Sequence, residues 1–186
     1  MPPSAADILD YVLIDSETLQ ARIKTLGEDI SRDYEGQEVI LVGILKGSVL
    51  FASDLMRTIT IPNKIDFMDV TSYGIGARES TGDVRILMDL HSPIEGKHVL
   101  IVEDIIDSGQ TMAQVLRLLD ARRPASLKIC TLLDKASRRE VDVQLDYVGF
   151  TIDNVFVFGY GLDIDEYYRN LPFIGVVKPG IEIQTE

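Results

Sequence analysis

Apolar residues occur in the chain at two spacings, one typical of amphipathic helices and one of buried strands. Leucine and isoleucine recur at intervals of four, three and four between residues 19 and 30, which predicts the apolar face of a helix. Asp15 and Ser16 come just before this pattern and suit the N-terminus of a helix. Residues 38–45 instead form a nearly continuous apolar run rich in β-branched side chains, which predicts a strand buried on both faces.

Strands and helices are predicted to alternate along the rest of the chain. Further strands are expected at residues 11–14, 65–73, 84–90, 98–102, 127–133, 147–151 and 155–158, and further helices at about 49–60 and from 112 to just before Pro124. Residues 74–83 contain three glycines and are expected to form a loop, and a glycine-rich acidic tail ends the sequence. This alternation predicts an α/β fold with a central, mainly parallel sheet flanked by helices.

Composition places the chain among folded globular proteins. Its 186 residues are 46% hydrophobic and 26% charged, which suits one domain and at most two. The formal net charge of −12 argues against non-specific binding to nucleic acids or anionic membranes, although a local phosphate site is compatible with it. The single cysteine, Cys130, excludes an intrachain disulfide, and the sequence shows neither a secretory signal nor an apolar stretch of bilayer length. We therefore expect a cytoplasmic protein.

The most informative segment follows the predicted strand at 98–102. Glu103 and Asp104 come directly after the apolar run, and Asp107-Ser-Gly-Gln-Thr111 opens the next helix. Ligands of open α/β sheets bind beyond the carboxyl ends of the strands, and a glycine turn at a helix N-terminus presents backbone N–H groups to a phosphate. Carboxylates beside a phosphate require a cation, and oxygen ligands suit Mg²⁺. The segment predicts a phosphorylated sugar or nucleotide held with magnesium; the alternative is a solvated strand end followed by a plain helix cap.

Residues 99–111 resemble the phosphoribosyl-pyrophosphate signature of type I phosphoribosyltransferases, and most closely that of the hypoxanthine-guanine phosphoribosyltransferases. The resemblance extends from about Tyr11 to Val177 and includes five further segments. These are the pyrophosphate loop Leu45–Ser48 with its cis Leu–Lys peptide, the start of a lid at Ser72–Gly74, the strand end Leu133–Lys135, and the segments Phe156–Asp163 and Tyr167–Leu171.

The resemblance implies a type I phosphoribosyltransferase fold in a single domain over residues 1–186. Its core would span about 36–150, and a small hood subdomain would be formed by about 1–15 and 151–186. The implied reaction transfers 5-phosphoribosyl from phosphoribosyl pyrophosphate to N9 of a 6-oxopurine with Mg²⁺, as in purine salvage. Hypoxanthine, guanine and xanthine remain open as substrates.

The resemblance also assigns roles to individual residues. Phosphoribosyl pyrophosphate would be bound by Lys46, Gly47, Glu103, Asp104, Ser108, Gly109, Gln110, Thr111 and Arg169. The purine would be bound by Lys135, Phe156, Val157 and Asp163, and the metal by Glu103, Asp104 and Asp163. Asp107 would exchange a proton with N7 of the purine, although it could instead cap the following helix. Ser72 and Tyr73 would begin the lid.

Two other functions share these motifs. One is a nucleotide-sensing RNA-binding regulator with the same fold, which should carry a basic face that a chain of net charge −12 offers only at residues 135–139. The other is a phosphoribosyltransferase for a different base, but a 6-amino purine would not suit a donor at Lys135. Partners are expected to be small-molecule substrates, without nucleic acid or membrane, and family members are commonly homodimers or homotetramers.

Overall fold

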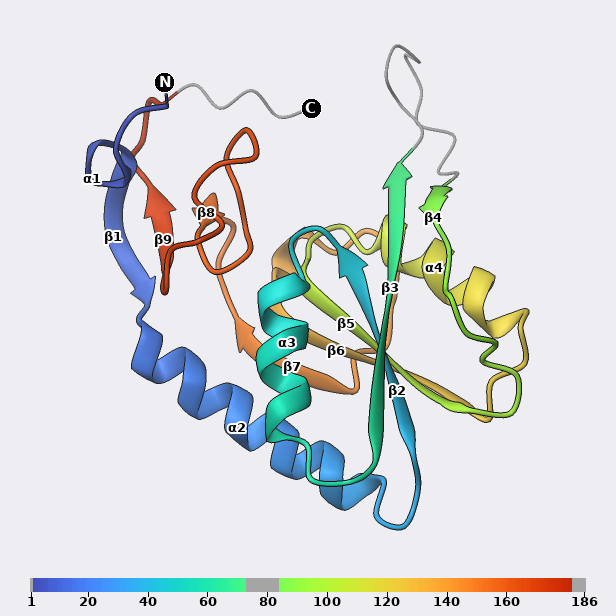
Figure 1. Ribbon diagram of the computed structural model, residues 1–186. Helices are drawn as coiled ribbons and strands as arrows, with labels where there is room; N and C mark the ends of the chain where they lie inside the picture. Colours follow the sequence, from blue (N-terminus) through green and yellow to red (C-terminus); the bar gives the residue numbers. More distant parts are fainter. Residues whose placement is uncertain (1, 73–83, 182–186) are drawn as a thin grey trace.

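The computed structural model describes residues 2–72 and 84–181 (Figure 1). Its first half contains α1 (Ala5–Ile8), β1 (Leu9–Ile14), α2 (Ser16–Asp33), β2 (Val39–Leu45), α3 (Val49–Thr58), β3 (Asn63–Ser72) and β4 (Val84–Met88). Its second half contains β5 (His98–Ile106), α4 (Gln110–Asp120), β6 (Ser126–Asp134), the short 3₁₀ helix η1 (Ala136–Arg138), β7 (Tyr147–Thr151), β8 (Val157–Phe158) and β9 (Ile174–Val177).

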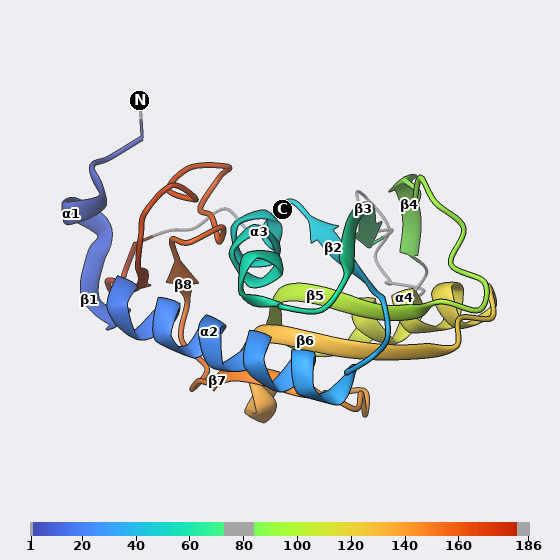
Figure 2. The ribbon, with the colours of Figure 1, turned by 60° about the horizontal axis from the view of Figure 1, so that its bottom comes forward.

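The larger sheet has six strands in the order β4-β3-β2-β5-β6-β7. All neighbouring pairs are parallel except β3 and β4, which run antiparallel at one edge. Helices α2 and α3 pack on one face and α4 packs on the other (Figure 2). The predicted α/β fold with a mainly parallel, helix-flanked sheet is therefore confirmed.

Local sequence explains the first helix and strand of this core. The Asp15 carboxylate accepts a hydrogen bond from the Thr18 backbone N–H at 2.8 Å, which caps α2 as its position predicted. The four apolar residues spaced along α2 are all buried, and so are six consecutive residues of β2. A strand in the middle of a sheet covered on both faces requires such an uninterrupted apolar run.

A second, three-stranded antiparallel sheet has the order β1-β9-β8, and we call it the hood sheet. Strands from both ends of the chain form it, and it lies beside α3 in Figure 1. Ile8, Phe158 and Val177 are buried in its own small core. The Tyr160 hydroxyl donates a 2.6 Å hydrogen bond to the Asp54 carboxylate on α3, which ties the hood to the larger sheet's helix layer.

Two expectations about the elements were wrong. The strand predicted to end at residue 102 continues to Ile106, because Glu103 pairs with Thr131 and Ile105 with Leu133 in β6 even after the pairing with β2 has ended. The supposed acidic tail contains β9, the central strand of the hood sheet. The loop predicted at 74–83 lies outside the described residues. None of the helices in the described ranges has the length and apolar character to cross a membrane.

Candidate active site

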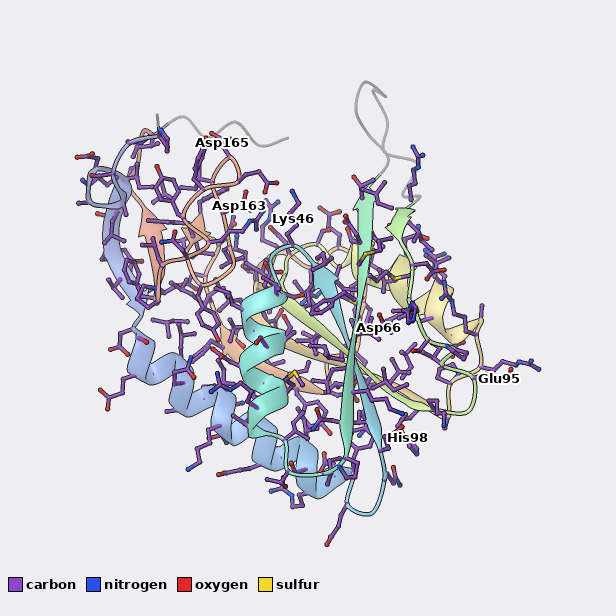
Figure 3. The ribbon with its side chains drawn as sticks, in the orientation of Figure 1. Lys46, Asp66, Glu95, His98, Asp163 and Asp165 are labelled. Carbon is purple, nitrogen blue, oxygen red and sulfur yellow. The ribbon has the colours of Figure 1, made fainter. Side chains whose placement is uncertain are left out.

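Three parallel strands end at the same edge of the larger sheet and deliver the predicted site residues there. Strands β2, β5 and β6 end at Leu45, Ile106 and Asp134. The segments that follow each of them therefore lie at one edge, where α/β sheets bind ligands. Figure 3 shows Lys46 and Asp163 together at this end of the molecule and His98 at the opposite end. The Leu45–Lys46 peptide bond is cis, as the resemblance implied.

The turn after β5 is braced from one side by the segment after η1. The Ser108 carbonyl accepts hydrogen bonds from the backbone N–H groups of Glu140 at 2.9 Å and Val141 at 3.1 Å. Gly109 has φ of 85°, and a Cβ there would lie 2.9 Å from the Val141 carbonyl oxygen, so this position requires glycine. The turn thus leads directly into the N-terminus of α4, where the Gln110 N–H donates a 3.3 Å hydrogen bond to Ser108 Oγ.

Next to this turn lies a pocket of about 160 Å³. It is lined by Glu103, Ile105, Ile106, Asp107, Ser108, Gly109, Thr111 and Met112. The N-cap of α4 is Gly109, so the alternative role of Asp107 as the helix cap is wrong. The Gln110 side chain is exposed and donates a 2.6 Å hydrogen bond to Glu140.

Glu103 and Asp104 lie within β5, and their buried carboxylates are only partly hydrogen-bonded. Glu103 Oε2 is buried and has no hydrogen-bond partner among the described residues, and burial raises the pKa of Glu103 well above its usual range. Burial likewise raises the pKa of Asp104 to about 6, although its Oδ1 accepts a 2.8 Å hydrogen bond from the Ile105 N–H. Arg169 lowers and Asp163 raises the pKa of Asp104, so both charges lie nearby.

These carboxylates fit a divalent cation that arrives with its substrate. No three potential ligands are arranged for a metal ion within the described ranges. Mg²⁺ is usually bound through one or two carboxylates together with substrate phosphates and water, and the unpartnered Glu103 oxygen offers it a ligand. Asp163, the third predicted ligand, belongs to the hood side of the site and accepts from Arg169 at 2.9 Å.

Asp107 lies between two basic side chains of the segment that follows β6. Its Oδ1 accepts a 3.0 Å hydrogen bond from Arg138 Nε, and its Oδ2 lies 3.9 Å from Lys135 Nζ. Lys135 is buried, and this burial lowers its pKa, while the Asp107 charge acts in the opposite direction. Sequence analysis had paired Asp107 and Lys135 with one substrate, and the structure brings them together. Arg138 had not been singled out.

The hood contributes a cluster of opposite charges above the loop that follows β2. The Arg169 guanidinium donates to the Gly161 carbonyl at 2.7 Å and contacts Asp163 at 2.9 Å and Glu166 at 3.3 Å. Glu166 also pairs with Lys46 at 3.0 Å. Arg169 Nε is buried without a partner in the described part of the chain. Glu166 thus bridges Lys46 and Arg169, although the motifs had given it no role.

Close backbone contact joins this hood segment to the core. A Cβ at Gly161 would lie 2.1 Å from the Gly47 carbonyl oxygen, and a Cβ at Gly47 would lie 1.7 Å from Asp104 Oδ2. Side chains at either position would force the segments apart. The two glycines therefore allow three separate segments of the chain to meet at one point.

Two of the four predicted purine-binding residues, Phe156 and Val157, lie at the edge of the hood sheet. The Phe156 carbonyl accepts from the Val177 N–H, so the next pair, Val157 with Val176, is the non-hydrogen-bonded one of this antiparallel ladder. The backbone N–H and C=O of Val157 therefore point away from β9, to the side of β8 that has no neighbouring strand among the described residues. Phe156 is 38% exposed, so it is not a core residue, and its ring remains available for stacking on a base.

Of the predicted lid residues, Ser72 is the last residue of β3, and Tyr73 lies outside the described residues.

Comparisons with known proteins agree with this arrangement. The family model for the phosphoribosyl transferase domain matches residues 14–165. A hypoxanthine phosphoribosyltransferase of Salmonella typhimurium is 52% identical over 168 residues, which cover 89% of this chain and 94% of that protein. The crystal structure of a hypoxanthine phosphoribosyltransferase from Staphylococcus aureus matches with a TM-score of 0.91 at 49% identity, covering 96% of this chain and 97% of that one.

One relative is matched over only part of its length. The bifunctional protein TilS/HprT of Listeria monocytogenes is 48% identical over 173 residues, 93% of this chain, but the chain spans only 26% of that protein's length. The family model nevertheless covers most of the chain, and the fold agrees over nearly its whole length. The chain therefore belongs to the phosphoribosyltransferase family.

Proposed function

We propose that this protein is a purine-salvage enzyme that transfers 5-phosphoribosyl from phosphoribosyl pyrophosphate to N9 of a 6-oxopurine, hypoxanthine or guanine, and releases pyrophosphate. The observation that carries the proposal is the placement of Asp107 and Lys135, 3.9 Å apart, beside the glycine turn at the N-terminus of α4. The names of the relatives described above support the choice of base.

The Asp107–Lys135 pair matches the chemistry of a 6-oxopurine. O6 and N7 are neighbours on one edge of the purine ring, and O6 is an acceptor. Lys135 would donate to O6, and Asp107 would accept the proton that leaves N7 as the base becomes nucleophilic at N9. A 6-amino purine presents a donor where Lys135 also donates, so adenine should be rejected.

Other side chains would hold the sugar and its leaving group. The backbone N–H groups at Ser108–Thr111 would bind the 5-phosphate, and Lys46, Gly47 and Arg169 would bind the pyrophosphate. Glu103 and Asp104 would orient the ribose hydroxyls and hold Mg²⁺, with Asp163 as a ligand on the hood side. Bound Mg²⁺ supplies positive charge that balances the departing pyrophosphate.

The reaction exchanges one bond for another at ribose C1. The bond to the pyrophosphate oxygen breaks, the bond to N9 forms, and the transition state has oxocarbenium character, as in glycoside chemistry. Water must be kept from this carbon. Phe156 would stack on the purine, Val157 backbone groups would read its edge, and Ser72 with Tyr73 would begin a closing lid.

Further properties complete the proposal. We place the enzyme in the cytoplasm and expect it to act on small molecules without binding nucleic acid or membranes. We also expect a homodimer or homotetramer. Light scattering of the purified protein would measure its oligomeric state.

A panel of free bases tests the proposal. The protein is incubated with phosphoribosyl pyrophosphate, Mg²⁺ and hypoxanthine, guanine, xanthine, adenine or uracil, and pyrophosphate release is followed. We expect release with hypoxanthine or guanine, and none with adenine or uracil. Release with adenine in preference to both 6-oxopurines would refute the proposal, and RNA retained on the protein at moderate salt would favour the regulator.

A further inference from the structure

Glu166 contacts both basic side chains that the proposed reaction needs for pyrophosphate. Its Oε1 accepts from Lys46 Nζ at 3.0 Å, and its Oε2 accepts from Arg169 Nη2 at 3.3 Å. Lys46 follows the last strand residue of β2, whereas Arg169 belongs to the hood segment. One carboxylate therefore bridges the two cations across the boundary between core and hood.

The local backbone holds this carboxylate in place. Asp165 and Glu166 both have left-handed backbone conformations, with φ of 50° and 68°, which side-chain-bearing residues rarely adopt. The Glu166 N–H donates a 2.8 Å hydrogen bond to Asp163 Oδ2, which fixes the turn. Glu166, which pairs with Lys46 and Arg169, is thus held in an unfavourable backbone conformation.

Pyrophosphate oxygens and carboxylate oxygens are acceptors for the same donors. Arg169 Nη1 contacts the Gly161 carbonyl and the Asp163 carboxylate, and Arg169 Nη2 donates to the Glu166 carboxylate. An anion that binds to the Lys46 ammonium and to this second nitrogen therefore competes with the Glu166 carboxylate for the same two positive charges. The side chains of Glu166 and Lys46 are both exposed. An anion can therefore reach their ion pair without any opening of the core.

We propose that Glu166 is an internal counter-anion of the pyrophosphate subsite, which occupies Lys46 and Arg169 when pyrophosphate is absent and is displaced when it binds. This inference rests on the function proposed above. Glu166 lowers the affinity for pyrophosphate through this competition and so favours its departure after transfer. It is a positioning residue, because it acts through the two cations.

Calorimetric titration with inorganic pyrophosphate in the presence of Mg²⁺ tests the proposal. The proteins compared are the wild type, Glu166→Gln and the matched control Asp165→Asn. Asp165 is an exposed acid on the same turn, it makes no ion pair in the described part of the chain, and Figure 3 shows it at the outer end of this hood segment. Both variants remove one negative charge, so only the loss of competition separates them.

We expect Glu166→Gln to bind pyrophosphate about threefold to tenfold more tightly than the wild type, the size of one or two exposed ion pairs. Asp165→Asn should change the affinity by less than about twofold. In a Lys46→Met background the gain from Glu166→Gln should shrink, because one of the released cations is gone. A merely structural Glu166 would give weaker binding instead.

The outcomes separate the inference from the function on which it rests. If the wild type binds pyrophosphate and Glu166→Gln binds it no more tightly than Asp165→Asn, the inference is overturned while the proposed function stands. If the wild type binds no pyrophosphate and transfers no phosphoribosyl group, the proposed function fails and the inference falls with it. Glu166→Ala carries the same expectation, so a folding defect in one variant leaves the test intact.

Discussion

Replacing Asp104 with asparagine should stabilise the protein at alkaline pH. Burial raises the pKa of this carboxyl from 3.8 to about 6 in the folded state, so the folded protein binds a proton that the unfolded chain has released. The resulting penalty is absent below about pH 3.8, grows as the pH rises to about 6, and is complete above it. At ~1.4 kcal/mol for each pKa unit, the difference corresponds to about 3 kcal/mol.

Asparagine has nearly the shape of aspartate but carries no charge, and it replaces one carboxylate oxygen by an NH2 group. Its side-chain oxygen can accept the 2.8 Å hydrogen bond from the Ile105 N–H that Asp104 Oδ1 accepts now. We expect a gain in the free energy of unfolding of about 1–3 kcal/mol at pH 8, and of less than about 1 kcal/mol at pH 4. The same variant should lose affinity for phosphoribosyl pyrophosphate, because Asp104 is a proposed ligand.

Urea unfolding of wild type and variant at the two pH values, without Mg²⁺, measures the effect. Asp165→Asn removes the same charge from an exposed position and should give no comparable gain. A variant that is less stable than the wild type at pH 8, or equally stabilised at both pH values, would refute the reasoning. The ionised Asp104 would then be well compensated in the folded protein.

Three further predictions concern the reaction. Asp107→Asn should lower kcat by about 10²–10⁴-fold with a small change in melting temperature, because an amide cannot accept the N7 proton, and a kcat near that of the wild type would remove Asp107 from this role. Lys135→Ala should raise KM for hypoxanthine more than for phosphoribosyl pyrophosphate, and equal increases would contradict its contact with O6. Gly47→Ala should weaken phosphoribosyl-pyrophosphate binding at least tenfold, because its Cβ would lie 1.7 Å from Asp104 Oδ2, and unchanged binding by a folded variant would show that the loop adapts.

The elements of the core were predictable because their signals are local. The helical spacing of α2 and the apolar run of β2 follow from which faces these elements bury. The end of β5 was missed because its last residues are held only by β6, so their strand conformation depends on a partner rather than on their own apolar pattern. β9 was missed for a related reason: it is a four-residue strand whose neighbour β1 comes from the other end of the described chain.

The site residues differ in the same way: some belong to a local motif, and others have roles that depend on contacts with residues distant in the sequence. Residues 103–111 carry a motif, and the glycine turn at the start of α4 follows directly from it. Glu166 could not be assigned a role this way, because its partner Lys46 lies 120 residues earlier in the chain. Arg138 follows Lys135 by three residues, in a basic stretch that was considered only as a face for RNA binding. Only the folded chain shows that its guanidinium meets the Asp107 carboxylate.

A net charge of −12 bears on how this chain would bind the anionic substrate proposed above. Its overall field repels phosphates, so long-range attraction contributes little to their capture. The local cations do not reverse this, because Lys46 is paired with Glu166, and Arg169 with both Glu166 and Asp163. In the proposed function, recognition therefore comes from short-range geometry: the N–H groups of the turn at α4, and carboxylates that a substrate would compensate with its metal. The buried, unpartnered oxygen of Glu103 is the clearest mark of that arrangement, because burial raises the pKa of this carboxyl and a bound cation would favour its ionised form.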